Sequence, residues 1–172
     1  PKLPFIRMHL HKCVPLGAGL GGGSSDASFA LKVLNKLFNL DLTDQQLMNY
    51  ADKLGSDCPF FILNKPCFAT SKGEILEEIT IDLSAYKFVI HTGDNFAKLK
   101  PALPIKSIKE IIAQPIKTWK KELQNDFEKI VFEQHNEVAD IKAALYAAGA
   151  IYASMSGSGS TVYGLFPKEK KL

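Results

Sequence analysis

Apolar and polar side chains alternate along residues 5–14, near the start of the chain. One side of the pattern carries Ile6, Met8, Leu10 and Val14, and the other carries Arg7, His9, His11 and Cys13. A period of two is typical of a strand with one buried face. Residues 5–14 are therefore predicted to form a half-buried strand.

Helical spacing replaces this alternation after a glycine-rich stretch. The apolar face of the first predicted helix comprises Ala27, Ala30, Leu31, Leu34, Leu37 and Phe38. A second helix is predicted from Thr43, because Thr43 and Gln46 have capping-box spacing, and Gly55 is placed to end it. Pro59 disfavours a helical conformation at Cys58, so a loop is predicted there.

The second half of the chain combines predicted strands and helices. A hairpin is predicted over residues 67–81 and a buried strand over 86–92. Helical character follows over 105–134, with a break at Pro115, and then a helix capped by Asn136. Two further strands are predicted over 150–155 and 161–166. The last two strands flank a loop with the sequence SGSGS.

Composition and charge narrow the class of protein. The 172 residues are 46% hydrophobic and 23% charged, which is enough apolar material for the core of one domain or two small ones. The net charge of +3 gives no basis for a nucleic-acid partner and fits an anionic small molecule equally well. The apolar runs are too short for a membrane-spanning helix.

Cysteine usage indicates a reducing compartment. Cys13, Cys58 and Cys67 are odd in number and lack CxxC spacing, so the sequence predicts neither a disulfide framework nor a zinc site. A cytoplasmic location is therefore expected.

Five glycines fall between Gly17 and Gly23, directly before the first predicted helix. The first amides of a helix have no partner within the helix and carry partial positive charge. Glycines allow phosphate oxygens to approach such amides closely. The stretch is interpreted as a phosphate-binding loop, although it is not a Walker loop. A flexible linker is disfavoured because patterned elements flank the stretch.

Three polar residues near this loop allow more than one interpretation. Lys12 falls in the apolar phase of the predicted strand, where it either extends its ammonium group to water or directs it at a ligand. Ser24 and Ser25 add hydroxyl donors, and either could also reach a metal ion held by the phosphates.

Three stretches resemble the motifs of the GHMP kinases, a family of small-molecule kinases. PLGAGLGGGSSDAS, residues 15–28, resembles the family's second motif in the form typical of the 4-diphosphocytidyl-2-C-methyl-D-erythritol kinases. LGSDCPFF, residues 54–61, resembles the segment that carries their catalytic aspartate, and SGSGSTVYGLF, residues 156–166, resembles the third motif. The stretches follow in the family's order, and the resemblance covers nearly the whole chain.

The resemblance implies an α+β protein with the GHMP kinase fold. Residues 1–84 would be part of the ATP-binding domain, which is similar to ribosomal protein S5, and residues 85–172 would be the ferredoxin-like C-terminal domain. The family's first motif, a strand with a catalytic lysine, has no counterpart in the sequence. The chain is therefore expected to be the C-terminal two-thirds of such a kinase, truncated at its N-terminus.

The implied reaction transfers the γ-phosphoryl group of ATP, with Mg²⁺, to the 2-hydroxyl of 4-diphosphocytidyl-2-C-methyl-D-erythritol in the non-mevalonate isoprenoid pathway. Asp57 falls on the catalytic base, an interpretation preferred over a turn former. The implied nucleotide contacts are Lys12, Pro15, Leu16, Gly17, Ala18, Gly19, Leu20, Gly21, Gly22, Gly23, Ser24 and Ser25, with Ser25 also a candidate Mg²⁺ ligand. Weaker candidates for substrate or phosphate contact are Gly157, Ser158, Gly159 and Ser160, which could instead form a plain hairpin turn.

Two other functions stay open. Another GHMP kinase, such as homoserine kinase, would share the fold, although the form of the motifs favours the cytidyl substrate. A nucleotide-binding fragment without activity is the second alternative, because the lysine strand is missing. An unpaired sheet edge at residues 5–14 would favour a homo-oligomer. Residues 92–96 depart from the family's usual turn and receive no role.

Overall fold

The chain folds into two compact units. The structure is a computed structural model that describes residues 3–15, 17–92 and 107–171. The first unit comprises the described residues of Pro1–Pro15 and Gly21–Thr80, and the second comprises those of Leu16–Leu20 and Ile81–Leu172. Both units combine helices with antiparallel strands, so the predicted α+β class is confirmed.

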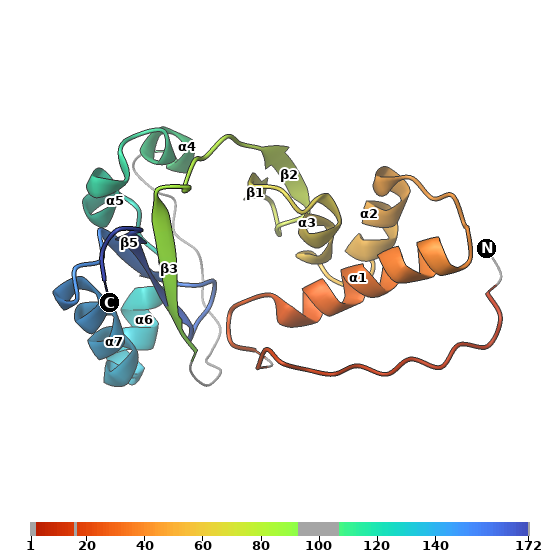
Figure 1. Ribbon diagram of the computed structural model, residues 1–172, viewed down its shortest axis with the longest axis horizontal. Coiled ribbons are helices and arrows are strands. Elements are labelled where there is room, and N and C mark those ends of the chain that lie inside the picture. Colours follow the sequence, from red (N-terminus) through yellow and green to blue (C-terminus); the bar gives the residue numbers. More distant parts are fainter. Residues whose placement is uncertain (1–2, 16, 93–106, 172) are drawn as a thin grey trace. The chain divides into compact units, whose positions relative to one another are not determined.

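Three helices and a hairpin make up the first unit (Figure 1). They are α1 (Gly22–Leu37), α2 (Asp44–Asp52), α3 (Cys58–Leu63), β1 (Cys67–Thr70) and β2 (Ile75–Glu78). Their shared core is built on Leu47, Ala51, Cys58 and Ile62. The fully buried Ser28 joins α1 to α3, because its hydroxyl donates a hydrogen bond of 2.8 Å to the carbonyl of Cys58.

Two local predictions for this unit are confirmed. The Thr43 hydroxyl accepts a hydrogen bond from the Gln46 amide at 3.3 Å, and the Gln46 side chain accepts one from the Thr43 amide at 2.9 Å. This reciprocal pair is the predicted capping box at the start of α2. β1 and β2 form the predicted antiparallel hairpin, in which Thr70 lies opposite Ile75.

The strand predicted over residues 5–14 is wrong for the part of the chain that the structure describes. No described strand lies beside this segment, and it forms no ladder. Phe5 is 92% exposed, and Met8 and Leu10 are each 61% exposed. Alternation identifies the face that a strand could bury, but a strand forms only where a neighbour accepts its backbone hydrogen bonds.

The loop predicted at Cys58 is also wrong, because α3 begins there. Pro59 lies in the first turn of this helix. The amide that proline lacks would have no partner within the helix at that position, and its fixed φ angle suits a helix start. Pro59 therefore initiates α3.

A three-stranded sheet with helices on both faces forms the second unit (Figure 1). Its elements are β3 (Tyr86–His91), α4 (Ile108–Ile112), α5 (Ile116–Glu122), α6 (Phe127–Gln134), α7 (Asn136–Ala147), β4 (Tyr152–Met155) and β5 (Val162–Pro167). The strands are antiparallel in the order β3-β5-β4. Helix is interrupted at Pro115, as predicted, and again between α5 and α6. Asn136 is the first residue of α7 instead of its predicted cap.

Period-two alternation assigns the strand side chains to two cores. Ala153, Val162 and Phe166 pack with residues of α6 and α7. Tyr152 and Leu165 pack with residues of α4 and α5, among them Trp119. The strand predicted as buried, β3, is instead an edge strand with Phe88 and Ile90 about half exposed, because helices and β5 cover only part of it.

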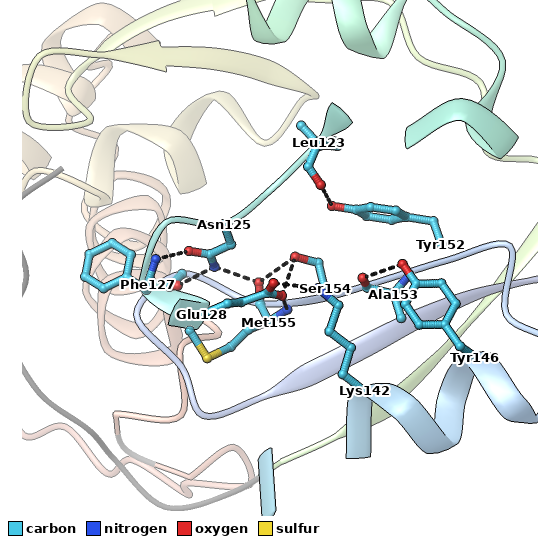
Figure 2. A network of polar contacts seen from close by, with 11 residues as sticks. Leu123, Asn125, Phe127, Glu128, Lys142, Tyr146, Tyr152, Ala153, Ser154 and Met155 are labelled. Atoms are coloured by element: carbon cyan, nitrogen blue, oxygen red, sulfur yellow. Dashed lines mark hydrogen bonds and ion pairs between the residues drawn. The ribbon is translucent and has the colours of Figure 1, made fainter. Parts of the chain in front are cut away.

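Side chains from the helices cover the outer edge of β4 (Figure 2). The Tyr146 hydroxyl lies 3.1 Å from both the amide and the carbonyl of Ala153, so it serves both backbone groups. The buried Glu128 carboxylate accepts hydrogen bonds from the Met155 amide at 2.8 Å and from the Ser154 hydroxyl at 3.2 Å, and it pairs with Lys142. An edge strand covered in this way cannot pair with another chain.

None of the helices in the described part of the chain combines the length and apolar character that crossing a bilayer requires. The three cysteines, all described, are free thiols.

Replacing Glu128 by alanine is expected to lower the free energy of unfolding by about 2–3 kcal/mol, because the Met155 amide and the Lys142 ammonium group both lose a charged partner. Glu128→Gln keeps an acceptor for the amide and should cost less. Urea denaturation of both variants measures the difference. Equal stability of Glu128→Ala and the wild type would contradict this account of the β4 edge.

Candidate functional site

Alternate glycines shape the stretch before α1. Gly17, Gly19 and Gly21 have φ angles of 70°, 76° and 63°, in the left-handed region that glycine adopts without steric cost. α1 begins at Gly22 with Gly21 as its N-cap. The predicted loop over residues 15–25 is thus a loop up to Gly21 followed by the first turn of the helix. Leu16 lies outside the described residues, as do residues 93–96 of the segment that received no role.

The start of α1 presents backbone donors. The Ser25 amide donates to the Gly21 carbonyl at 2.8 Å and is the first helical donor, so the amides of Gly22, Gly23 and Ser24 have no acceptor within the helix. A Cβ atom added at Gly23 would meet nothing within 4 Å. Gly23 is exposed, and free amides at an exposed helix start are donors to which an anion can bind.

Lys12 lies beside this first turn. A Cβ atom added at Gly22 would come within 3.0 Å of the Lys12 Nζ atom and 3.4 Å of Val14 Cγ1. The ammonium group forms an ion pair with Asp26 on α1. The Lys12 ammonium group therefore lies next to the helix N-terminus but is paired with a carboxylate, and its role toward a ligand stays a prediction.

A second contact, within the second unit, joins Gly19 to the loop of residues 156–160. The Ser156 hydroxyl donates to the Gly19 carbonyl at 2.8 Å, and the Thr161 amide donates to the Ala18 carbonyl at 3.2 Å. A Cβ atom on Gly19 would collide with the carbonyl oxygens of Ser156 and Gly159. The two glycine-rich loops, 138 residues apart at Gly19 and Gly157, thus pack backbone against backbone.

Two buried hydroxyl groups in this region lack partners. Ser160 and Thr161 are 1% and 0% exposed, and neither side-chain oxygen has a hydrogen-bond partner in the part of the chain that the structure describes. Leaving a buried hydroxyl unpaired costs about 1–3 kcal/mol. Such groups call for an explanation, and a ligand oxygen is one.

Asp57 is the N-cap residue of α3, and it is exposed. Its side chain makes no capping hydrogen bond, which weakens the turn-former interpretation. The carboxylate faces the β1–β2 turn, where a Cβ atom added at Gly73 would lie 3.0 Å from Asp57 Oδ1. An exposed carboxylate that caps nothing is available to accept a proton.

Sequence reasoning missed two contributors to the loop of residues 156–160. Ser156 was part of the motif but was given no role, although its hydroxyl bonds Gly19. Asn125 donates to the carbonyls of Met155 at 2.9 Å and Gly157 at 2.7 Å. No motif contains Asn125, and a contact across 30 residues leaves no local pattern in the sequence.

The chain matches two family models in succession. The GHMP kinases N-terminal domain matches residues 2–65, and the GHMP kinases C-terminal domain matches residues 107–172. The chain belongs to the GHMP kinase family. Both glycine-rich stretches described above lie inside the matched residues.

Two of the most similar curated relatives carry the same name. The chain is 49% identical over 178 residues to a 4-diphosphocytidyl-2-C-methyl-D-erythritol kinase of Bacteroides fragilis, covering 99% of this chain and 65% of the relative. It is 52% identical over 174 residues to the kinase of the same name from Bacteroides thetaiotaomicron, covering 97% of this chain and 64% of the relative. The chain thus spans just under two-thirds of the length of these relatives.

Two solved structures are similar to this chain. A crystal structure of 4-(cytidine 5'-diphospho)-2C-methyl-D-erythritol kinase superposes with a TM-score of 0.68 at 29% identity, covering 90% of this chain and 59% of that one. A homoserine kinase from Cytophaga hutchinsonii superposes with a TM-score of 0.52 at 20% identity, covering 92% and 59%. The second likeness shows the shared fold alone.

Gly19→Ala is expected to destabilise the protein by about 2–3 kcal/mol, because alanine is strained at a positive φ and its Cβ atom meets two backbone carbonyls. Gly23→Ala is the matched control, since open space surrounds that position and alanine favours helix. Urea denaturation compares the two variants. The loop contact would be refuted by a Gly19→Ala variant as stable as Gly23→Ala.

Proposed function

We propose that this GHMP kinase transfers the γ-phosphoryl group of ATP to the 2-hydroxyl of 4-diphosphocytidyl-2-C-methyl-D-erythritol, in the non-mevalonate pathway to isoprenoids. In this proposal residues 1–84 belong to the ATP-binding domain and residues 85–172 to the C-terminal domain. The substrate follows from the names of relatives that are about half identical to the chain over nearly all of its length.

One observation carries the proposed ATP site: the start of α1 combines free backbone donors with glycines, of which Gly23 is exposed and would have no neighbour within 4 Å of an added Cβ atom. The amides of Gly22, Gly23 and Ser24 have no acceptor within the helix, and the Lys12 ammonium group, which Asp26 holds in an ion pair, lies beside them. Phosphoryl transfer depends mainly on positioning and on stabilising negative charge. Residues 15–25 supply donors and charge of this kind.

The loop of residues 156–160 is proposed as a further phosphate or substrate contact. The buried Ser160 hydroxyl lacks a partner in the described part of the chain, and an oxygen of the ligand would supply one. Gly157 and Gly159 have φ angles of 55° and 92°, so the loop's shape, like that of residues 17–21, depends on glycine.

Magnesium is proposed as the metal that accompanies ATP. The described residues hold no group of three or more histidine, cysteine, aspartate or glutamate side chains arranged for a metal ion. Ser25, in the first turn of α1, offers a hydroxyl oxygen of the hard type that Mg²⁺ accepts beside phosphate oxygens. When bound, the ion would neutralise charge on the phosphates.

Asp57 is proposed as the general base. It would accept the proton of the attacking 2-hydroxyl, whose oxygen forms the new bond to phosphorus while the bond to the ADP oxygen breaks. Its exposure and the absence of a capping bond support this role.

Location and assembly complete the proposal. A cytoplasmic location is consistent with three free thiols, and no nucleic-acid or membrane partner is invoked. A homo-oligomer is proposed on the exposed apolar side chains of residues 5–14, among them Phe5 and Met8. Light scattering coupled to gel filtration measures its mass, and a monomer at all concentrations would refute this part.

Gly23→Val is expected to weaken ATP binding about tenfold or more, because the side chain occupies the space that phosphate oxygens would enter. Lys36→Val, in the last turn of the same helix, is the control for adding valine to α1. Isothermal titration calorimetry measures both affinities. Unchanged affinity in Gly23→Val would exclude the start of α1 as the phosphate site.

Asp57→Asn is expected to lower kcat about 100-fold or more while ATP affinity changes little, because the amide cannot accept the proton. Asp52→Asn removes a charge from α2 in the same unit and serves as the control. A coupled assay of ADP release measures turnover of the intact gene product. Turnover near the wild-type rate in Asp57→Asn would rule out its role as base.

The same assay separates the alternative functions. The cytidyl substrate should support ADP release and homoserine should not. ADP release with homoserine alone would replace the proposed substrate, and ATP binding without turnover on either would leave a nucleotide-binding protein.

A further inference from the structure

Asn125 lies between α5 and α6 and uses its whole side-chain amide (Figure 2). The nitrogen donates to the carbonyls of Met155 at 2.9 Å and Gly157 at 2.7 Å, and the oxygen accepts from the Phe127 amide at 2.9 Å. A primary amide has two N–H donors, so both are committed to backbone on either side of Ser156.

These hydrogen bonds of Asn125 form a clamp on the backbone around Ser156. Ser156 connects this clamp to the glycine loop that precedes α1. Its hydroxyl donates to the Gly19 carbonyl at 2.8 Å, and its amide donates to the Thr161 carbonyl at 2.8 Å. The backbone on both sides of Ser156 is held by Asn125, so the direction of the hydroxyl toward Gly19 depends on that clamp. All of these residues belong to the second unit.

Asn125 is itself held firmly. Tyr152 on β4 donates its hydroxyl to the Leu123 carbonyl at 3.1 Å, two residues before Asn125. Burial raises the pKa of the Tyr152 hydroxyl far above its usual range, so this donor stays protonated. On the other side, Glu128 in α6 accepts from the Met155 amide.

We propose that Asn125 is a positioning residue for nucleotide binding: it holds the loop of residues 156–160 in the form that packs on Gly19, and so fixes the phosphate loop. The proposal rests on the proposed ATP site for its ligand. Asn125 need not touch ATP, because it acts through Ser156 and Gly19. Neither aspartate nor alanine can replace it, since both lack the two N–H donors.

Asn125→Asp tests the clamp through its pH dependence. The carboxylate would face two carbonyl oxygens and repel them, whereas the protonated carboxyl can donate to one of them. ATP affinity, measured by calorimetry, should be about tenfold below wild type near pH 8, as for a lost hydrogen bond that leaves acceptors unpaired. The loss should be smaller near pH 5.5, because the facing carbonyl oxygens disfavour the charged form and so raise the pKa of the new carboxyl above its ordinary value.

The control is Asn35→Asp, at a matched pair of backbone bonds in the first unit. The Asn35 side chain donates to the Leu42 carbonyl and accepts from the Leu42 amide, each at 3.0 Å. The charged groups that line a cavity together with Asn125, namely Lys120, Asp126, Glu128, Lys129 and Lys142, are unchanged in all variants, and the titration of ATP itself is common to all. Their contributions to the pH dependence therefore cancel when the ATP affinity of each variant is divided by that of the wild type at the same pH.

A readout without ligand separates this inference from the proposed function. In amide NMR spectra of the free protein, Asn125→Asp should shift the resonances of Gly17, Gly19 and Ser156 near pH 8 and return them toward wild type near pH 5.5. Asn35→Asp should leave them in place. If wild type fails to bind ATP, the proposed function is wrong, and these spectra still decide whether the clamp sets the loop.

Two results would overturn the inference. One is wild-type resonances of Gly19 and Ser156 in Asn125→Asp at both pH values. The other is a loss of ATP affinity in Asn125→Asp that is equal at both pH values or equal to the loss in Asn35→Asp, since a general loss of stability would behave in that way.

Discussion

One close backbone contact, between Gly19 and the loop of residues 156–160, holds the two glycine-rich stretches of the second unit together. The contact leaves no room for a Cβ atom on Gly19, and hydrogen bonds from Ser156 and Thr161 fix its register. Glycine at this position is therefore a packing requirement as well as a conformational one.

The edge of β4 supplies the rigidity behind that contact. Tyr146, Glu128 and Asn125 bond the outward backbone groups of Ala153 and Met155, which another strand would bond in a larger sheet (Figure 2). These side chains come from α6, α7 and the segment before α6. Partly buried polar groups whose hydrogen bonds are all made hold a unique geometry. The loop of residues 156–160 follows directly after β4 in the chain.

Much of the fold and the site was predictable because the signals are local. Thr43 and Gln46 specify a capping box within four residues, and the alternation around residues 150–166 specifies β4 and β5 with the loop between them. The helix after the glycine stretch was predictable from the spacing of its apolar residues. The roles of the residues in the glycine stretch and of Asp57 stay predictions that mutants can test.

The failures share a physical cause, since each depends on contacts between distant parts of the chain. Alternation in residues 5–14 could not show whether a strand lies alongside, and the rule against helix before proline does not hold where proline occupies a first turn, as at Pro59. Asn125 escaped notice because its partners lie 30 and 32 residues away. Side-chain bonds of this kind become visible only in three dimensions.

The central claim is that the two packed glycine loops respond to nucleotide together. An amide NMR titration of the intact gene product with ATP and Mg²⁺ tests it most directly. The account predicts that the largest shifts fall on Gly19 and Gly23 and, at the same ATP concentrations, on Gly157 and Ser160. Saturable shifts confined to one loop, or to residues outside both, would contradict it.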